Sequence, residues 1–233
     1  MKVCVIFARG GSTRIPNKSI KDFYGRPILS YSIQTALESK LFDRVYVDSD
    51  SDEILRVARE YGAEVSKRPE SLGKNEVALA TLTEYFLQSP KGRHVRDICV
   101  LLPTAPLLSK DTLSSAFLHY QRQCPRRGVV SVCEFPYPVR RALRIEKHGT
   151  KSELSFQWPE HEFTMSQDLE VLYHDAGQFY ILSASYFNKH KKVFVPKAEP
   201  IVLDRMKVCD IDTMSDWREA EFKYKYLKEK GEL

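Results

Sequence analysis

Short apolar runs alternate with amphipathic stretches along the chain as far as Glu134. A short apolar run bounded by polar residues is typical of a buried strand, whereas apolar residues three or four positions apart indicate one face of a helix. The expected strands are Lys2–Phe7, Arg44–Asp48, Glu64–Ser66, Ile98–Leu102 and Val129–Glu134. The expected helices between them are Ile28–Ser39, Asp52–Tyr61, Val77–Leu87 and Thr112–Gln121.

Regular alternation of strands and helices favours a parallel sheet, because a helix carries the chain back to the start of the next parallel strand. We therefore expect an α/β fold that is Rossmann-like, with a mostly parallel twisted sheet and helices on both faces. Ligands of such sheets bind beyond the carboxyl ends of the strands. The loops expected at that edge are Ala8–Lys18, Ser49–Asp52, Pro103–Ser109 and the region after Cys133.

The pattern changes in the segment 135–172, which is rich in proline, aromatic residues and charge. It contains two short β-like pieces, Leu143–Glu146 and Leu154–Trp158, and keeps large apolar side chains such as Phe163. Flexible linkers contain few large apolar side chains, so we expect an arm or a small subdomain here. The elements expected beyond it are a return strand at Gly177–Leu182, an edge strand at Pro200–Leu203 and a terminal helix at Met214–Lys230, capped by Thr213 or Ser215.

The composition fits one large α/β domain or two small ones, since the chain has 233 residues, 42% of them hydrophobic. The longest apolar runs have five or six residues, too few to span a membrane, and the N-terminus has no signal-peptide pattern. We therefore expect a cytoplasmic protein without a membrane partner. The net charge of +5 suits an anionic substrate. No aromatic-plus-basic module points to nucleic acid.

The five cysteines of the chain predict neither a zinc site nor a disulfide framework, because their number is odd and they form no C-x-x-C pair. Three of them fall in expected strands, where a thiol usually serves as a small buried apolar group. The cysteines are Cys4, Cys99, Cys124, Cys133 and Cys209.

The stretch Ala8–Lys18 combines glycines with cations directly after the first expected strand. Glycines let a backbone approach a ligand closely and leave N–H groups free to point at it. The cations Arg9, Arg14 and Lys18 lie within ten residues of one another, which suits a polyanion such as a nucleoside triphosphate. The stretch matches neither the P-loop nor G-x-G-x-x-G. A glycine turn with surface cations is the simpler alternative, but three clustered cations favour phosphate binding.

Two carboxylates stand two residues apart at Asp210 and Asp212, shortly before the terminal helix. In an extended segment, residues two apart project on the same side, so both side chains can converge on one cation. Mg²⁺ prefers oxygen ligands and usually keeps waters and substrate phosphates as well. Helix capping is the alternative, and it is the better interpretation for Asp216. Capping needs only one side chain, so we favour a metal role for the pair.

Hydrogen-bonding side chains are dense in the stretches 166–170 and 173–180. A polyhydroxylated substrate needs such groups for its orientation. His174 is a candidate base within this region, although a lone histidine beside a strand more often has a structural role.

These motifs, taken in order along nearly the whole chain, resemble those of the nonulosonate cytidylyltransferases, the CMP-sialic acid synthetase family. The family's opening, L-A-R-x-G-S-K-x-[IL]-x-x-K-N, is similar to Phe7–Ser19, with Thr13 in place of its first lysine and Arg14 next to it. The other matches are V-S-T-D at Val47–Asp50, R-P-x-x-L at Arg68–Leu72, P-T-S-P at Pro103–Pro106 and D-I-D-T at Asp210–Thr213. Within the family, Ser166–Leu169 followed by Tyr173–Gly177 looks most like the pseudaminic acid cytidylyltransferases.

The resemblance implies a fold of the nucleotide-diphospho-sugar transferase type. Residues 1–233 would form a single nucleotidyltransferase domain, with 135–172 as an insertion for dimerisation and sugar binding. The implied reaction joins CTP to a nonulosonic acid, a nine-carbon α-keto sugar acid, and releases pyrophosphate. The sugar's anomeric hydroxyl attacks the α-phosphate in line. Mg²⁺ is the implied cofactor and a homodimer the implied assembly.

The resemblance also assigns residues to roles. The nucleotide would contact Ala8, Arg9, Gly10, Gly11, Ser12, Arg14, Lys18 and Arg68. The sugar would lie near Gln167, Asp168, Tyr173 and Gln178. The catalytic residues would be Arg9, Lys18 and Asp212, with Asp210 and Asp212 holding the metal. Two alternatives stay open: a cytidylyltransferase for sialic, legionaminic or 3-deoxy-octulosonic acid, and a nucleotide-binding protein that has lost turnover.

Overall fold

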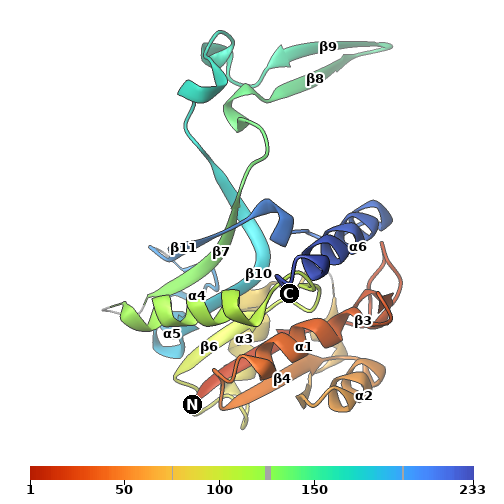
Figure 1. Ribbon diagram of the computed structural model, residues 1–233, viewed down its shortest axis with the longest axis vertical. Coiled ribbons are helices and arrows are strands. Elements are labelled where there is room, and N and C mark those ends of the chain that lie inside the picture. The colour runs from red at the N-terminus through yellow and green to blue at the C-terminus, as the bar shows by residue number, and fades with distance from the viewer. Residues whose placement is uncertain (75, 124–126, 196) are drawn as a thin grey trace.

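A computed structural model describes the chain except for residues 75, 124–126 and 196. Its centre is a seven-stranded sheet in the order β11-β7-β10-β6-β1-β4-β5 (Figure 1). The strands are β1 (Lys2–Phe7), β4 (Arg44–Ser49), β5 (Glu64–Lys67), β6 (Asp97–Leu101), β7 (Gly128–Glu134), β10 (Tyr173–Ser183) and β11 (Glu199–Leu203). A two-stranded ribbon, β2 (Asp22–Phe23) and β3 (Arg26–Pro27), precedes the first helix.

The sheet is mostly parallel, as the sequence predicts. β1 pairs in parallel with both β4 and β6, β4 with β5, and β11 with β7. Only β10 runs against its neighbours β6 and β7 among the described strands of this sheet. The carboxyl ends of β1, β4, β5 and β6 therefore meet at one edge, where a ligand of this fold is expected.

Helices cover both faces of the sheet, again as predicted (Figure 1). Alternate residues of β1 point to opposite faces, so Cys4 and Ile6 enter one apolar cluster and Val3 and Val5 another. The first face is covered by α1 (Ile28–Glu38), α2 (Asp52–Glu60) and α4 (Lys110–Arg122). The second face is covered by α3 (Leu79–Gln88) and α5 (Ala184–His190).

Several boundaries differ from those expected from the pattern. β10 begins at Tyr173 rather than at Gly177, because a register shift near Gly177, whose φ is +60°, lets the strand continue past an irregularity. The helix α5 was not predicted, since its seven residues show too short a periodicity. Of the cysteines, Cys4, Cys99 and Cys133 are buried in strands as expected. Cys124 lies outside the described residues.

The terminal helix α6 (Met214–Glu229) packs on a third apolar cluster. Thr213 is its N-cap and forms a capping box with Asp216, which confirms the structural interpretation of that carboxylate. The cluster joins α6 to the start of α1 and to the loop after β1; its core includes Ile15, Phe23, Tyr31, Ile211, Trp217 and Tyr224.

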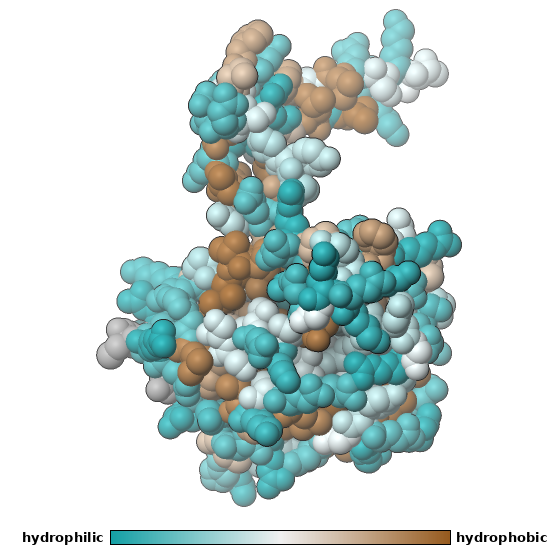
Figure 2. All heavy atoms as spheres, viewed as in Figure 1, coloured by the Kyte–Doolittle hydropathy of each residue, from teal (hydrophilic) through white to brown (hydrophobic). Residues whose placement is uncertain are grey.

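A hairpin of β8 (Leu143–His148) and β9 (Lys151–Phe156) stands away from the sheet (Figure 1). The chain reaches it from β7 and returns from it to β10. Both β-like pieces expected in 135–172 overlap these strands, but β8 continues to His148 and β9 covers Lys151–Phe156 rather than Leu154–Trp158. The arm carries apolar side chains in contact with solvent, visible as brown spheres in Figure 2. Examples are Leu143, Ile145, Leu154 and Phe163, which are 55–89% exposed. Within the described residues, no helix combines the length and apolar character needed to cross a bilayer.

Candidate functional site

The loop Ala8–Lys18 leaves the carboxyl end of β1 and runs along the edge of the sheet. Ala8 still follows the sheet, since its N–H donates to the carbonyl oxygen of Asp48 at 3.0 Å. Next, the Gly10 N–H donates to Asp50 Oδ1 at 3.2 Å, and the Ser12 N–H donates to the Gly10 carbonyl at 3.0 Å. The glycine turn is thus fixed against the end of β4.

The two later cations of the loop meet the carboxylate motif near the other end of the chain. Arg14 Nη1 lies 2.8 Å from Asp212 Oδ2. Lys18 Nζ donates to the Ile211 carbonyl oxygen at 2.6 Å and lies 3.5 Å from Asp212 Oδ1. The structure therefore brings together two of the three predicted phosphate-binding cations and one predicted metal ligand.

An apolar contact holds these two segments in place. Ile15 of the loop and Ile211 of the carboxylate motif are each 1% exposed, and both belong to the cluster around Trp217. Because Ile211 points into the core, Asp210 and Asp212 on either side of it project outward, as the alternation of an extended segment predicts.

The two carboxylates influence each other electrostatically. Asp210 is an exposed residue, yet the surrounding protein partly desolvates its carboxyl group. This desolvation, followed by the nearby charge of Asp212, raises the pKa of Asp210, while Lys18 opposes the rise. The pKa of Asp216 is instead lowered, chiefly by the backbone N–H of Thr213. Asp216 thus behaves as a cap and the other two as a facing pair.

The pair fits a magnesium site. Two carboxylates that repel each other are stabilised by a divalent cation, and Mg²⁺ commonly takes one or two protein carboxylates and completes its shell with water and phosphate oxygens. Among the described residues, no group of three or more His, Cys, Asp and Glu side chains offers an all-protein metal site. Asp210 and Asp212 would then need ligands from the substrate.

Arg68 lies beneath the loop rather than open to solvent. Its side chain is 1% exposed and donates to Asp48, to the Ala8 carbonyl and to Asp50. Burial raises the pKa of Asp48 even though the Arg68 guanidinium opposes the rise. A direct contact between Arg68 and a nucleotide stays a prediction. Its observed contacts support the loop from below.

The four predicted sugar residues are not gathered in one place within a single chain. Gln167 and Asp168 lie on the arm, in the short helical turn Ser166–Asp168. Tyr173 begins β10 and is 48% exposed. Gln178 is 2% exposed within the sheet, where its Nε2 donates to the Lys207 carbonyl. The common sugar site stays a prediction.

Two polar groups near the site were not singled out from the sequence. Asp50 contacts the loop, and the available signals were its position after a strand and the V-S-T-D match at Val47–Asp50. Tyr180 donates to Asp175, and burial together with this carboxylate raises the pKa of Tyr180. The candidate base His174 instead contacts the Asp175 carbonyl through Nδ1 at 2.8 Å and packs against Phe135.

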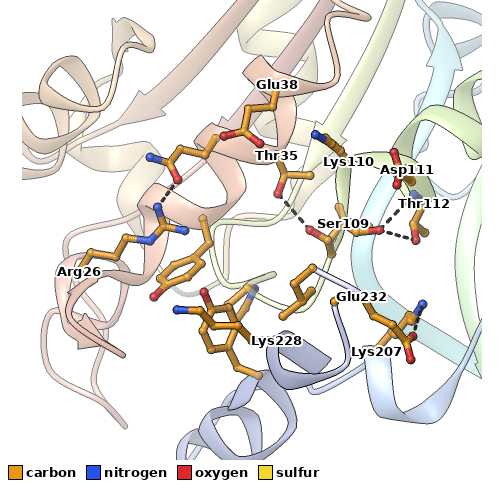
Figure 3. A pocket seen from close by; sticks show the side chains of 17 residues that line it. Arg26, Thr35, Glu38, Ser109, Lys110, Asp111, Thr112, Lys207, Lys228 and Glu232 are labelled. Carbon is orange, nitrogen blue, oxygen red and sulfur yellow. Dashed lines mark hydrogen bonds and ion pairs between the residues drawn. The ribbon is translucent and has the colours of Figure 1, made fainter. Parts of the chain in front are cut away.

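A cavity of about 620 Å³ opens elsewhere, between α1, the start of α4 and the end of α6 (Figure 3). Its walls mix cations and anions: Lys207 pairs with Glu232 at 2.9 Å, and the Arg26 guanidinium stacks on Tyr31. None of the loop residues 8–18 lines it. We therefore place the candidate site at the loop, where cations, a glycine turn and carboxylates converge.

The influence of Asp212 on Asp210 predicts how the pKa of Asp210 changes when Asp212 is replaced. The raised folded-state pKa of Asp210 means that this group contributes stability at low pH and that the contribution is lost as pH rises through that pKa. In Asp212→Asn, one cause of the rise disappears, so the pKa of Asp210 should fall. Carboxyl ¹³C NMR titration measures it. Asp111→Asn, an exposed change on α4, is the control and should leave it unaltered. An unchanged or higher value in Asp212→Asn contradicts the pairing.

Known proteins resemble the chain over nearly its whole length. Residues 3–228 match the family model described as Cytidylyltransferase. The chain is 37% identical to the pseudaminic acid cytidylyltransferase of Campylobacter jejuni subsp. jejuni serotype O:2, over 96% of each protein. It is 28% identical to the CMP-N,N'-diacetyllegionaminic acid synthase of Legionella pneumophila, over 94% of each.

The fold is shared with more distant proteins. A solved structure of CMP:2-keto-3-deoxy-manno-octonic acid synthetase complexed with CTP has a TM-score of 0.69 at 12% identity, covering 95% of this chain and 97% of that one. The family model covers almost the whole chain, from residue 3 to residue 228. The chain belongs to the cytidylyltransferase family.

Proposed function

We propose that this protein transfers the cytidylyl group of CTP to a nonulosonic acid, with pseudaminic acid the favoured acceptor, and releases pyrophosphate. The observation that supports a triphosphate site is the contact of Lys18 and Arg14 with Asp212, which joins the cationic loop to the carboxylate pair. The choice of acceptor rests on the 37% identity to the Campylobacter jejuni pseudaminic acid cytidylyltransferase.

In this proposal the loop binds the triphosphate and stabilises the leaving group. The backbone of Gly11 would meet phosphate oxygens, helped by Ser12, while Gly10 forms the turn through its N–H contact with Asp50. Arg9 and Lys18 would neutralise the charge that develops on pyrophosphate as it leaves. Lys18 is well suited to this, because its ammonium group is already held by the Ile211 carbonyl and little freedom is lost on binding.

Asp210 and Asp212 would hold Mg²⁺. The ion would lower the negative charge that an attacking sugar hydroxyl meets at the α-phosphate. The chain's own contribution is to keep both carboxylates on one side of an extended segment, with Ile211 buried as the anchor. Arg14 would leave Asp212 when the ion arrives and become available to the triphosphate, taking the place of the lysine that Thr13 replaces.

We also propose a cytoplasmic homodimer formed through the arm. The exposed apolar side chains of β8 and β9 need a partner surface, and a second copy supplies one. In a dimer, the arm of one copy can lie against the sheet of the other. Such an arrangement would return Gln167 and Asp168 to a sugar site near Tyr173.

Legionaminic acid is the second candidate acceptor, because the Legionella pneumophila CMP-N,N'-diacetyllegionaminic acid synthase is 28% identical over 94% of the chain. Both acids would use the same loop and the same carboxylates. The two acids would therefore differ only in their contacts with the residues that surround the sugar. Activity with a panel of acids separates the two candidates.

The test of the function is pyrophosphate release with Mg²⁺, either CTP, UTP or ATP, and a panel of pseudaminic, legionaminic, sialic and 3-deoxy-octulosonic acids. Pseudaminic acid should give the highest kcat/KM, and Asp212→Ala should abolish release while the protein stays folded. Release only with UTP or ATP would overturn the cytidylyl assignment. No release with any of the acids would overturn the proposed enzyme activity.

The contact between Arg14 and Asp212 predicts opposite effects on two ligands. Without nucleotide, Arg14→Ala should bind Mn²⁺ about two- to fivefold more tightly, because a competing cation is gone. Its KM for CTP should rise about tenfold, because a phosphate contact is lost. Mn²⁺ electron paramagnetic resonance and steady-state kinetics measure the two effects.

The control for this comparison is Arg44→Ala, which removes another exposed, paired arginine. Arg44 begins β4, whereas the loop lies at the carboxyl end of that strand. It should change neither quantity. If Arg14→Ala leaves Mn²⁺ affinity unchanged or weakens it, Arg14 does not compete with the metal for Asp212.

A further inference from the structure

Arg68 ties together the ends of three strands below the loop. It follows β5, and its guanidinium donates to the Asp48 carbonyl at 2.7 Å and to Asp48 Oδ1 at 2.9 Å, both on β4. It also donates to the Ala8 carbonyl, just past β1, at 3.0 Å. Buried charges are retained only where partners of this kind satisfy them. The guanidinium is therefore a fixed point in the floor of the loop.

Asp50 connects this fixed point to the glycine turn. One oxygen, Asp50 Oδ1, accepts from Arg68 Nη2 at 3.3 Å and from the Gly10 N–H at 3.2 Å. The turn lies close against this segment, since a Cβ on Gly10 would be 3.0 Å from Ser51 Cβ. The orientation of one backbone N–H in the phosphate-binding loop thus depends on where the Asp50 carboxylate points.

The other side of the carboxylate rests on Gly73. A Cβ built on Gly73 would lie 2.3 Å from Asp50 Oδ2 and 2.6 Å from Asp50 Cγ, closer than real contacts allow. Gly73 is not among the glycines with positive φ, so its backbone suits other residues. The absence of a side chain at Gly73 therefore matters for the room it leaves to Asp50.

We propose that Asp50, oriented by Arg68 and seated against Gly73, is a positioning residue that sets the Gly10 turn and thereby the affinity for the nucleotide triphosphate. Its consequence for affinity rests on the proposed function, because the loop is taken to bind CTP. Asp50 itself touches no reacting atom in this account and acts through the backbone of Gly10.

Removing the charge of Asp50 while keeping its acceptor oxygen distinguishes a positioning role from a direct electrostatic effect on nucleotide binding. A carboxylate beside a polyanion is unfavourable, and the nearby Arg68 offsets it. What the loop requires is a hydrogen-bond acceptor of the right shape. Asp50→Asn keeps the acceptor oxygen and removes the charge, whereas Asp50→Ala removes both. A positioning role therefore predicts that asparagine rescues what alanine loses.

The experiment compares the natural chain with Asp50→Asn, Asp50→Ala, Gly73→Ala and the double variant Asp50→Ala/Gly73→Ala. The CTP dissociation constant and KM should rise about tenfold in Asp50→Ala and in Gly73→Ala, with kcat changed less, since one hydrogen bond to the turn is lost. Asp50→Asn should stay within about threefold of the natural chain. The double variant should be no worse than Asp50→Ala, because both changes act on one contact.

Hydrogen exchange of the Gly10 amide supplies a readout that needs no nucleotide. Exchange should accelerate in Asp50→Ala and Gly73→Ala and stay slow in Asp50→Asn. Ser71→Ala, an exposed change on the same turn as Gly73, is the matched control and should alter neither exchange nor affinity.

The outcomes separate the two proposals. If the natural chain does not bind CTP but Gly10 exchange follows this pattern, the contact stands, while the proposed function and the effect on affinity fail. If the natural chain binds CTP while Gly73→Ala and Asp50→Ala change neither exchange nor affinity, the positioning role is wrong. A loss in Asp50→Asn as large as in Asp50→Ala would assign the effect to charge and overturn it too.

Discussion

The contact between the loop after β1 and the extended segment before α6 is the interaction on which the site depends. The two segments are nearly two hundred residues apart in sequence, yet Ile15 and Ile211 share one apolar cluster. Burial of these two side chains fixes the backbone on either side of them. The charged groups Arg14, Lys18 and Asp212 then meet at the surface without each needing its own anchor. Apolar packing thus sets the geometry, and the exposed ion pairs add little stability of their own.

Beneath this contact, a buried ionic network fixes the first half of the loop. Arg68 and Asp48 are almost completely enclosed, so their charges must satisfy each other. The same guanidinium reaches the Ala8 carbonyl and Asp50. The loop is therefore held from two sides: polar contacts at its start and apolar contacts at its middle. The glycine turn and the cations of the loop therefore lie at one edge of the sheet, where ligands of such folds bind.

Local signals predicted much of the fold. β1 has the expected bounds, and the cap at Thr213 and the role of Asp216 follow from side-chain chemistry within one helical turn. Contacts between distant segments were harder to predict. The sequence placed Arg68 near a nucleotide because of a motif, but its partner Asp48 is twenty residues away and only the pairing of β4 with β5 brings them together. The burial of Gln178 was likewise not predicted, because the carbonyl group that accepts its hydrogen bond, that of Lys207, belongs to a distant segment.

The arm shows the same limit at a larger scale. Its strands were visible in the sequence and an arm or small subdomain was expected there, but alternation of apolar and polar residues does not say which surface its side chains face. Leu143, Ile145 and Leu154 on these two strands are 55–68% exposed.

We infer that the loop and the carboxylate pair form one site for metal and nucleotide together. Paramagnetic broadening of backbone amide signals by Mn²⁺ tests it most directly. With CTP present, the signals of Gly10, Lys18 and Asp212 should broaden together, before that of Thr112 in the cavity beside α4. Broadening at Thr112 or on the arm, with the loop signals unaffected, would contradict the claim.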